Sequence, residues 1–273
     1  MGWSIVESFV ESKVDGRESE DVVVASAHFA AVIDGATDET GALFAGKSGG
    51  RFAAETLASA IEDLDEHTDA TEFTDRLTAA LSAGAGAAGP LSPDTRWPSA
   101  SLICLSFSRN EIWRIGDCNF MIDHTPNIGT KRVAAAAYSF RAAINAALLA
   151  AGTPLNEILS NDPGSAAARP LFDLQQQLTN RAGPWGYGCL NGRTVPDEYI
   201  EVFPIGPEIK EVVLTTDGYP EIAPTLQLTE ARLDELQSTD PAAIDTLWTV
   251  GKSLHPGFNS MDDRAYLRLR ATP

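Results

Sequence analysis

The sequence predicts an α+β sandwich formed by one domain over residues 1–273. Segments with strand character follow one another in blocks, and pairs of helical segments lie between the blocks. This order favours packed sheets over a doubly wound parallel sheet, in which strands and helices alternate strictly. The chain has 273 residues, of which 44% are hydrophobic, so it can bury a full core without a second domain.

The first third of the chain is expected to contain three strands and a helix. Residues 4–9 and 22–33 are rich in β-branched and aromatic side chains, which favour strands. The second run is interrupted near residues 26–28, so we expect it to form the two strands of a hairpin. Apolar residues then recur at helical spacing over residues 48–64, which predicts a helix.

A second helix and another hairpin are expected next. The helix should cover residues 72–82, with Thr71 as its N-cap. Residues 83–98 are rich in Gly, Ala and Pro and are expected to form a loop. Two further apolar runs, at residues 100–107 and 111–115, are close enough in the chain to pair as a hairpin.

The second half of the chain is expected to open with a strand and a long helical segment. The strand covers residues 121–125, and residues 132–179 are mostly helical, with breaks near residues 151–154 and 161–164. The remaining elements are strands at 199–203, 211–216 and 265–269 and helices at 229–237 and 241–254.

The charge of the chain limits the classes of partner. A formal net charge of −18 argues against nucleic acid or an anionic membrane as the main partner, because both repel an acidic surface. The most membrane-like stretch, residues 133–151, is mostly alanine and is interrupted by Arg141 and Asn145, so we interpret it as a soluble helix. The acidic composition fits sites that collect cations.

The cysteines indicate neither disulfides nor zinc. Cys104, Cys118 and Cys189 are an odd number without CxxC spacing, which favours a reducing, cytoplasmic location. Cys118 follows an acid, so we expect a raised thiol pKa and no role as a nucleophile. The N-terminus lacks a basic region followed by a long apolar stretch, so a secretory signal is not expected.

Acidic residues stand at the ends of at least five predicted strands. Two apolar runs end in Asp-Gly, at Asp34-Gly35 and Asp217-Gly218, and others are bordered by Glu20-Asp21, Asp117 and Asp262-Asp263. Singly, each Asp-Gly is ordinary turn chemistry, because Asp bonds its own backbone and Gly accepts positive φ. Together, they would bring several carboxylates to the surface ends of strands, where an enzyme would hold metal ions.

Converging carboxylates need cations or protons. Two like charges about 4 Å apart cost about 4 kcal/mol at an effective dielectric constant near 20. Ligand sets made only of oxygen select hard ions such as Mg²⁺ or Mn²⁺. The four histidines occur in no HxH or HxxxH spacing, so zinc hydrolase chemistry is a poor fit.

The acidic motifs resemble, in order and context, those of the PP2C (PPM) family of metal-dependent protein phosphatases. Glu20-Asp21 is similar to the early Glu-Asp motif of that family, and Ile115-Gly116-Asp117-Cys118 to its Gly-Asp-Ser motif. The two Asp-Gly strand ends match its two aspartate-glycine motifs, and Asp262-Asp263 its terminal Asp-Asn or Asp-Asp. The resemblance extends from about residue 7 to residue 269, and the ordered set is more specific than any one motif.

The resemblance implies a four-layer α-β-β-α sandwich of two mainly antiparallel sheets, with two Mn²⁺ or Mg²⁺ ions at one end. By motif, Asp34 would bridge both ions. The carbonyl of Gly35 and one acid of Glu20-Asp21 would complete one site, with the choice between the two acids left open. Asp217 and Asp262 would hold the other ion, and Asp117 would bind a third, weaker one.

The activity that the resemblance implies is hydrolysis of phosphoserine or phosphothreonine in a phosphoprotein substrate, by attack of a metal-bridging water. Asp34 and Asp217 would be the catalytic residues through that water, and Arg17 would contact the substrate phosphate. Two alternatives remain open: a weak or inactive PP2C-like binding or regulatory module, and a phosphatase of a small phosphorylated metabolite.

Three departures from the family pattern concern the substrate side. Arg17 lies three positions before Glu20, whereas relatives usually place an arginine four positions before that acid. Ala36 stands where some relatives have a histidine that acts as general acid, and Cys118 replaces the serine of Gly-Asp-Ser. A helical insertion around residues 132–180 occupies a region that is shorter or variable in relatives, and its role is open.

Overall fold

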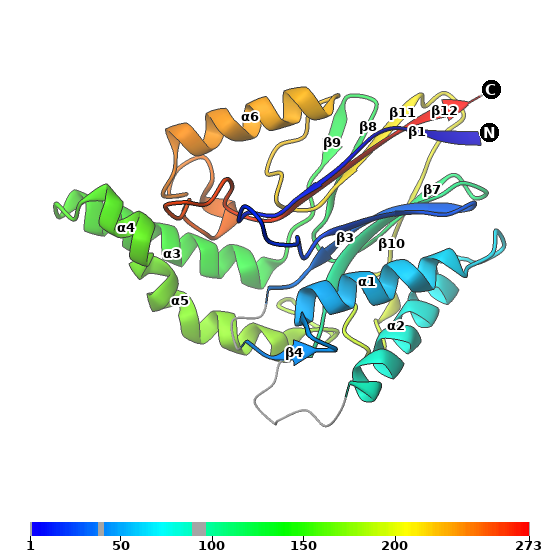
Figure 1. Ribbon diagram of the computed structural model, residues 1–273, viewed down its shortest axis with the longest axis horizontal. Coiled ribbons are helices and arrows are strands. Elements are labelled where there is room, and N and C mark those ends of the chain that lie inside the picture. The colour runs from blue at the N-terminus through cyan, green and yellow to red at the C-terminus, as the bar shows by residue number, and fades with distance from the viewer. Residues whose placement is uncertain (1, 38–40, 89–96, 273) are drawn as a thin grey trace.

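Two five-stranded antiparallel sheets form the centre of the molecule (Figure 1). The structure is a computed structural model that describes residues 2–37, 41–88 and 97–272. One sheet has the order β1-β12-β11-β8-β9 and comprises Gly2–Glu11, Arg264–Thr272, Glu211–Thr215, Asn119–Ile122 and Thr125–Asn127. The other has the order β10-β7-β6-β3-β2 and comprises Glu201–Pro204, Glu111–Ile115, Ala100–Ser106, Phe29–Gly35 and Val22–Ala25. A short ribbon of β4 (Leu43–Phe44) and β5 (Lys47–Ser48) lies outside both sheets.

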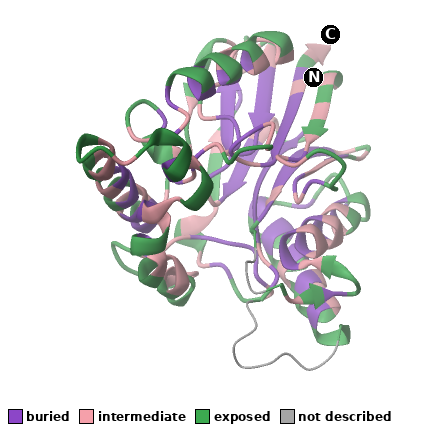
Figure 2. Ribbon diagram, turned by 60° about the vertical axis from the view of Figure 1, so that its left-hand side comes forward, coloured by how far each residue is buried: buried purple, intermediate pink, exposed green. Residues whose placement is uncertain are grey.

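Strand β3 shows how the sandwich is held together. Its side chains alternate between two faces, as in any strand. Ala30 and Val32 pack between the two sheets, against residues such as Leu214 of β11. Phe29 and Ile33 face the opposite side and join a second apolar cluster with the helices. Both faces of β3 are buried, which agrees with its almost continuous apolar run. Burial is concentrated in the central strands and on the inward faces of the helices (Figure 2).

Helices α1 (Gly49–Glu62) and α2 (Ala70–Ala87) cover the outer face of the β3 sheet. Ser48 caps α1 by accepting a hydrogen bond from the Arg51 backbone N–H. The predicted N-cap of the second helix is wrong, because Asp69, and not Thr71, accepts the Glu72 backbone N–H at 2.9 Å. This helix also continues to Ala87 in the region expected to be a loop, and residues 89–96 of that predicted loop lie outside the described residues.

Helix α6 (Leu226–Thr239) covers the outer face of the other sheet. Its Leu233 packs with Val213 of β11 and Tyr266 of β12. The layers are therefore helices, sheet, sheet and helix, which confirms the predicted sandwich of antiparallel sheets flanked by helices.

Three helices lie beyond the end of the sandwich that is remote from the chain termini (Figure 1). They are α3 (Arg132–Ala150), α4 (Leu155–Asn161) and α5 (Pro163–Leu174), so the segment expected to be helical is helical. By length and composition α3 would suffice to cross a membrane, with a mean hydropathy of 1.4. It packs against α5, however, and buries the polar side chains of Arg141 and Asn145.

Several predicted boundaries are wrong, and one predicted helix is not formed. Residues 241–254 contain only a 3₁₀ turn, Trp248–Val250. The Asp240 carboxylate accepts the backbone N–H groups of Ile244, Asp245 and Leu247, and so competes with helical bonding. The predicted strand at 121–125 is divided between β8 and β9 by a turn at Asp123, where φ is 50°. The predicted strand at 199–203 begins later because residues 197–199 form a 3₁₀ turn.

Candidate metal centre

The strand ends that carry the predicted acids meet at one end of the sandwich. Strand β3 ends in Asp34-Gly35, and β11 is followed by Thr216 and Asp217. Asp117 lies in the turn between β7 and β8, and Asp21 and Asp263 directly precede β2 and β12. Because all neighbouring strands are antiparallel, these starts and ends lie at the same edge.

Three of the carboxylates converge on one point. Asp34, Asp117 and Asp217 each place an oxygen atom within 4.8 Å of the other two. The Asp34 and Asp217 side chains form no hydrogen bond or ion pair with any described residue. These two Asp-Gly acids, 183 positions apart in the sequence, are therefore unpaired among the described residues, whereas the third convergent acid, Asp117, pairs with Lys131.

The glycines after these aspartates allow close backbone approaches. A Cβ atom on Gly35 would lie 2.5 Å from the carbonyl oxygens of Glu20 and Gly50. A Cβ atom on Gly218 would lie 2.0 Å from the carbonyl oxygen of Asp263. Real Cβ atoms do not come this close to backbone oxygens, so only glycine lets the acidic segments approach one another here.

Glu20 and Asp21 face different surroundings. The Glu20 carboxylate accepts a hydrogen bond from the Ser48 hydroxyl at 2.5 Å, so it is tied to the start of α1. The Asp21 carboxylate is buried and accepts a hydrogen bond from the Thr216 hydroxyl at 2.7 Å. Thr216 directly precedes Asp217 in the chain, so this hydrogen bond holds Asp21 beside the end of β11 that carries a convergent acid.

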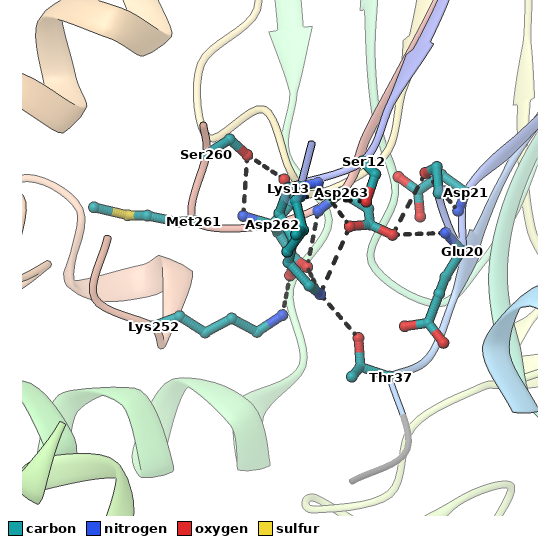
Figure 3. A network of polar contacts seen from close by, with 12 residues as sticks. Ser12, Lys13, Glu20, Asp21, Thr37, Lys252, Ser260, Met261, Asp262 and Asp263 are labelled. Atoms are coloured by element: carbon teal, nitrogen blue, oxygen red, sulfur yellow. Dashed lines mark hydrogen bonds and ion pairs between the residues drawn. The ribbon is translucent and has the colours of Figure 1, made fainter. Parts of the chain in front are cut away.

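The two acids of the last motif have separate roles (Figure 3). Asp263 accepts the backbone N–H groups of Lys13 and Glu20 at 3.0 and 2.6 Å, so it joins the β1–β2 connection to the start of β12. Asp262 instead pairs with two ammonium groups, those of Lys13 at 2.9 Å and of Lys252. The shortest hydrogen bonds of Asp263 thus come from backbone N–H groups, while the ion pairs of Asp262 come from two lysine side chains.

Asp117 is also paired with a lysine. The Lys131 ammonium lies 2.6 Å from Oδ1 of Asp117 and donates to the Ser101 hydroxyl at 3.2 Å. The Ser101 hydroxyl donates to the same carboxylate oxygen at 2.8 Å. Ser101 lies opposite Asp34 in the β3–β6 register, so this network borders the convergent site directly.

The acids of the site differ in pKa because of these partners. Burial raises the pKa of Asp34 and of Asp217 well above the ordinary value, and neighbouring carboxylates raise both further. Burial opposes ionisation of Asp117 and Asp262 as well, but the adjacent lysines outweigh it and lower the pKa of both carboxyl groups. Burial also raises the pKa of Asp21, which accepts a hydrogen bond from Thr216 but pairs with no described cation. Asp21, Asp34 and Asp217 thus lack a cation among the described residues, whereas Asp117 and Asp262 each have one.

The residues of this site fit a hard divalent cation. All three convergent ligand atoms are carboxylate oxygens, and Asp34 and Asp217 lack partners among the described residues. A divalent ion held by Asp34 and Asp217 would offset the burial and the like-charge repulsion that raise the pKa of these two carboxyl groups. Asp21, which accepts a hydrogen bond from the residue before Asp217, is a further buried acid at this end of the sandwich.

Arg17 lies apart from the convergent carboxylates. Its side chain is exposed and pairs with no described residue. It lines an open cavity of about 500 Å³ together with Ser19, Asp21 and Arg51. Ala36, the first residue after the Asp34-Gly35 strand end, is exposed.

Sequence reasoning did not identify the basic and hydroxyl groups of this site. Lys13, Lys131 and Lys252 belong to no motif, and they reach the acids from three distant connections. Ser101 is one small residue in an apolar strand. The alternation of β6 could have indicated the direction of Ser101, but only pairing with β3 places it beside Asp34.

These features define a fold, a PP2C-type sandwich, with a cluster of carboxylates at one end. No protein-family model and no curated protein matches the chain. Among solved structures, the serine/threonine phosphatase PstP/Ppp of Mycobacterium tuberculosis aligns over 100% of both chains with a TM-score of 0.52 and 14% identity. The serine/threonine phosphatase Stp1 of Staphylococcus aureus aligns over 98% of this chain and 94% of its own, with a TM-score of 0.50 and 12% identity. At these identities the likeness shows the fold, and it confirms the PP2C-type architecture that the ordered motifs predicted.

Proposed function

We propose that the protein is a metal-dependent phosphatase that hydrolyses phosphoserine or phosphothreonine in proteins. The observation that carries this proposal is the convergence of Asp34, Asp117 and Asp217 oxygens within 4.8 Å, with Asp34 and Asp217 unpaired among the described residues. The fold supports it, because PstP/Ppp and Stp1 are serine/threonine phosphatases. Fold alone does not define an activity, so the site carries the argument.

The roles of the residues follow from their chemistry. Asp34 and Asp217 would hold Mn²⁺ or Mg²⁺, with the Gly35 carbonyl and Asp21 as further candidate ligands. Asp262, which the motif resemblance also assigns to an ion, is paired with Lys13 and Lys252 and would have to exchange these partners for the ion. Bound divalent ions would supply charge stabilisation for phosphoryl transfer and would make a water molecule more acidic. The protein itself would fix the Asp34 and Asp217 carboxylates in a partly buried position, where their attraction for a cation is stronger than in bulk water.

Recognition of the phosphate group requires a cation outside the carboxylate cluster. Arg17 remains our candidate, because its exposed guanidinium is unpaired among the described residues and borders a cavity next to Asp21. An arginine suits a phosphate because its planar fork can donate two hydrogen bonds. We expect Arg17→Ala to raise KM for a phosphopeptide more than it lowers kcat.

Hydrolysis of an aryl phosphate tests the proposed activity. We expect turnover to require added Mn²⁺ or Mg²⁺, to stop with EDTA, and to fall at least about 100-fold in Asp34→Asn and Asp217→Asn. Asp75→Asn is the matched control, since Asp75 is an exposed acid on α2 and should leave turnover unchanged. Absence of metal-dependent turnover on aryl phosphate and on phosphopeptides would leave a binding or regulatory module.

The substrate class is decided by a direct comparison. A small phosphorylated metabolite remains the second candidate, because helices α3 to α5 lie at the end of the sandwich that bears the acids and could restrict access (Figure 1). We expect phosphopeptides to be hydrolysed with higher kcat/KM than a panel of sugar and nucleotide phosphates. The reverse order would identify a metabolite phosphatase.

We further propose that the protein works in a reducing compartment such as the cytoplasm. Cys104, Cys118 and Cys189 are all buried and free, which is compatible with a compartment that keeps thiols reduced.

A further inference from the structure

The acids of the metal centre differ in whether a lysine side chain pairs with them. Asp34 and Asp217 have no ion pair or hydrogen bond with a described side chain, whereas Asp117 accepts from both Lys131 and Ser101. Among the described cations, Lys131 forms an ion pair with one of the three convergent acids, Asp117. A positive charge of the chain therefore already stands inside the acidic cluster.

The Lys131 side chain is confined on several sides. Its ammonium lies 2.6 Å from Asp117 and 3.2 Å from Ser101, and the ring of Tyr187 lies 5.4 Å from it on another side. Only 18% of the side chain is exposed, which is low for a lysine. Three different segments thus surround this ammonium group.

The backbone on both sides of Lys131 is also fixed. A Cβ atom on Gly129 would lie 2.5 Å from the carbonyl carbon and oxygen of Asp117, so this connection runs directly against the acid. The Gly129 backbone N–H donates to the Asn119 side chain at 2.8 Å. On the other side, helix α3 begins at Arg132, whose guanidinium stacks 4.6 Å from the Trp185 ring. The lysine is therefore held at the acid by the start of the helical insertion.

We propose that Lys131 is a resident cation, meaning a charge of the chain that permanently neutralises Asp117, and that Asp117 is consequently not a ligand of the divalent ions. The proposal rests on the proposed function only in that Asp34 and Asp217 hold those ions. An ion on the second oxygen of Asp117 would face the ammonium across a single carboxylate, and like charges at that distance repel strongly in a buried site. Removing the ammonium should therefore turn Asp117 into an additional ion site.

The number of bound Mn²⁺ ions tests this directly, without any measurement of turnover. Metal-stripped protein is titrated with Mn²⁺, and free Mn²⁺ is counted by its electron paramagnetic resonance signal. We expect Lys131→Met to bind one more ion than the wild type, since methionine keeps the unbranched shape of the lysine side chain, one atom shorter, without its charge. Lys131→Arg should bind the wild-type number, because the positive charge is retained.

Substitution of the acid gives a second, independent measurement. Asp117→Asn should bind the same number of ions as the wild type, whereas a metal ligand at this position would lose one. The double variant Lys131→Met with Asp117→Asn should return to the wild-type number. Lys210→Met, which removes an exposed lysine elsewhere, is the matched control.

The outcomes separate this inference from the proposed function. Equal ion counts in the wild type and in folded Lys131→Met, or loss of an ion in Asp117→Asn, would overturn the resident cation. If Lys131→Met does not fold, the Asp117→Asn count still decides. A gain of one ion by Lys131→Met in a protein without phosphatase turnover would support the resident cation and contradict the function, and absence of Mn²⁺ binding in every variant would contradict both.

Discussion

Arg141 is expected to be a main attachment of the helical insertion. Its guanidinium is fully buried and pairs with Asp162 at 2.8 Å. It also donates to the carbonyl oxygens of Ala242 and Ala243 at 2.9 Å each and to the Ser253 hydroxyl at 2.6 Å. One side chain thus connects α3, the α4–α5 junction and the segment that carries Lys252.

Replacing Arg141 by methionine should destabilise the protein strongly. The change leaves the Asp162 carboxylate and two carbonyl groups without their main donor, and breaking a buried pair from one side typically costs about 3–5 kcal/mol. At roughly 2 °C per kcal/mol for a chain of this size, the melting temperature should fall by about 6–10 °C. Thermal unfolding followed by circular dichroism measures this shift.

Two further variants show whether the loss comes from the network. Arg76→Met removes an exposed Arg76–Glu72 pair on α2 and should cost only about 0.3–0.5 kcal/mol. Adding Asp162→Asn to Arg141→Met should cost little more, because asparagine keeps the cap of α5 and removes the unpaired charge. A melting temperature of Arg141→Met equal to that of Arg76→Met would refute the reasoning.

Three other results are expected. Gly35→Ala should destabilise the fold by about 1–3 kcal/mol, because the new Cβ atom would meet two backbone oxygens. Gly86→Ala, in a helix with open space around the residue, should stabilise the fold by about 0.5–1 kcal/mol. Urea unfolding measures the free energy of unfolding of both variants. In EDTA the melting temperature should rise as the pH falls from 8 to 5. The pKa values of Asp34 and Asp217 are raised in the folded protein, so the folded state takes up protons at a pH where the unfolded chain, with aspartate pKa values of about 3.8, does not. No such rise in the wild type, or an equal rise in Asp34→Asn, would contradict this. The native protein should not react with a thiol reagent at pH 8, because all three cysteines are buried and burial raises their pKa. In denaturant, three thiols should react. A fast-reacting thiol in the native protein would contradict the burial.

The strands could be predicted from sequence because their local patterns and their packing agree. The runs that became β3 and β11 are apolar and β-branched, and both are buried in the sandwich. The helix expected over 241–254 failed for the opposite reason. Its apolar spacing suits a helix, but Asp240 binds the backbone N–H groups that follow it, and Ala243 and Gly251 adopt positive φ. Side-chain capping of this kind is not visible in hydrophobic periodicity.

The acids of the candidate site could be located by their position after strands, but their partners could not. Asp34 and Asp217 follow apolar runs, so their arrival at a surface edge follows from strand geometry. Lys131 and Lys252 reach the acids through the tertiary arrangement of the insertion and the loop after α6. Contacts between distant segments therefore decide which acid is paired with a lysine and which is free. Lys13 and Asp262, for example, are more than a hundred residues apart in the sequence.

The contact between Gly35 and Gly50 has a mechanical consequence. A Cβ atom on Gly50 would lie 2.7 Å from the carbonyl carbon of Gly35, so the first turn of α1 and the end of β3 touch backbone to backbone. No compressible side chain lies between them, and the Ser48–Glu20 hydrogen bond ties the same turn to the neighbouring acid. A displacement of α1 should therefore displace the end of β3 and the Asp34 carboxylate with it. Binding of another molecule to the outer surface of this helix should thus change the distances between the carboxylates.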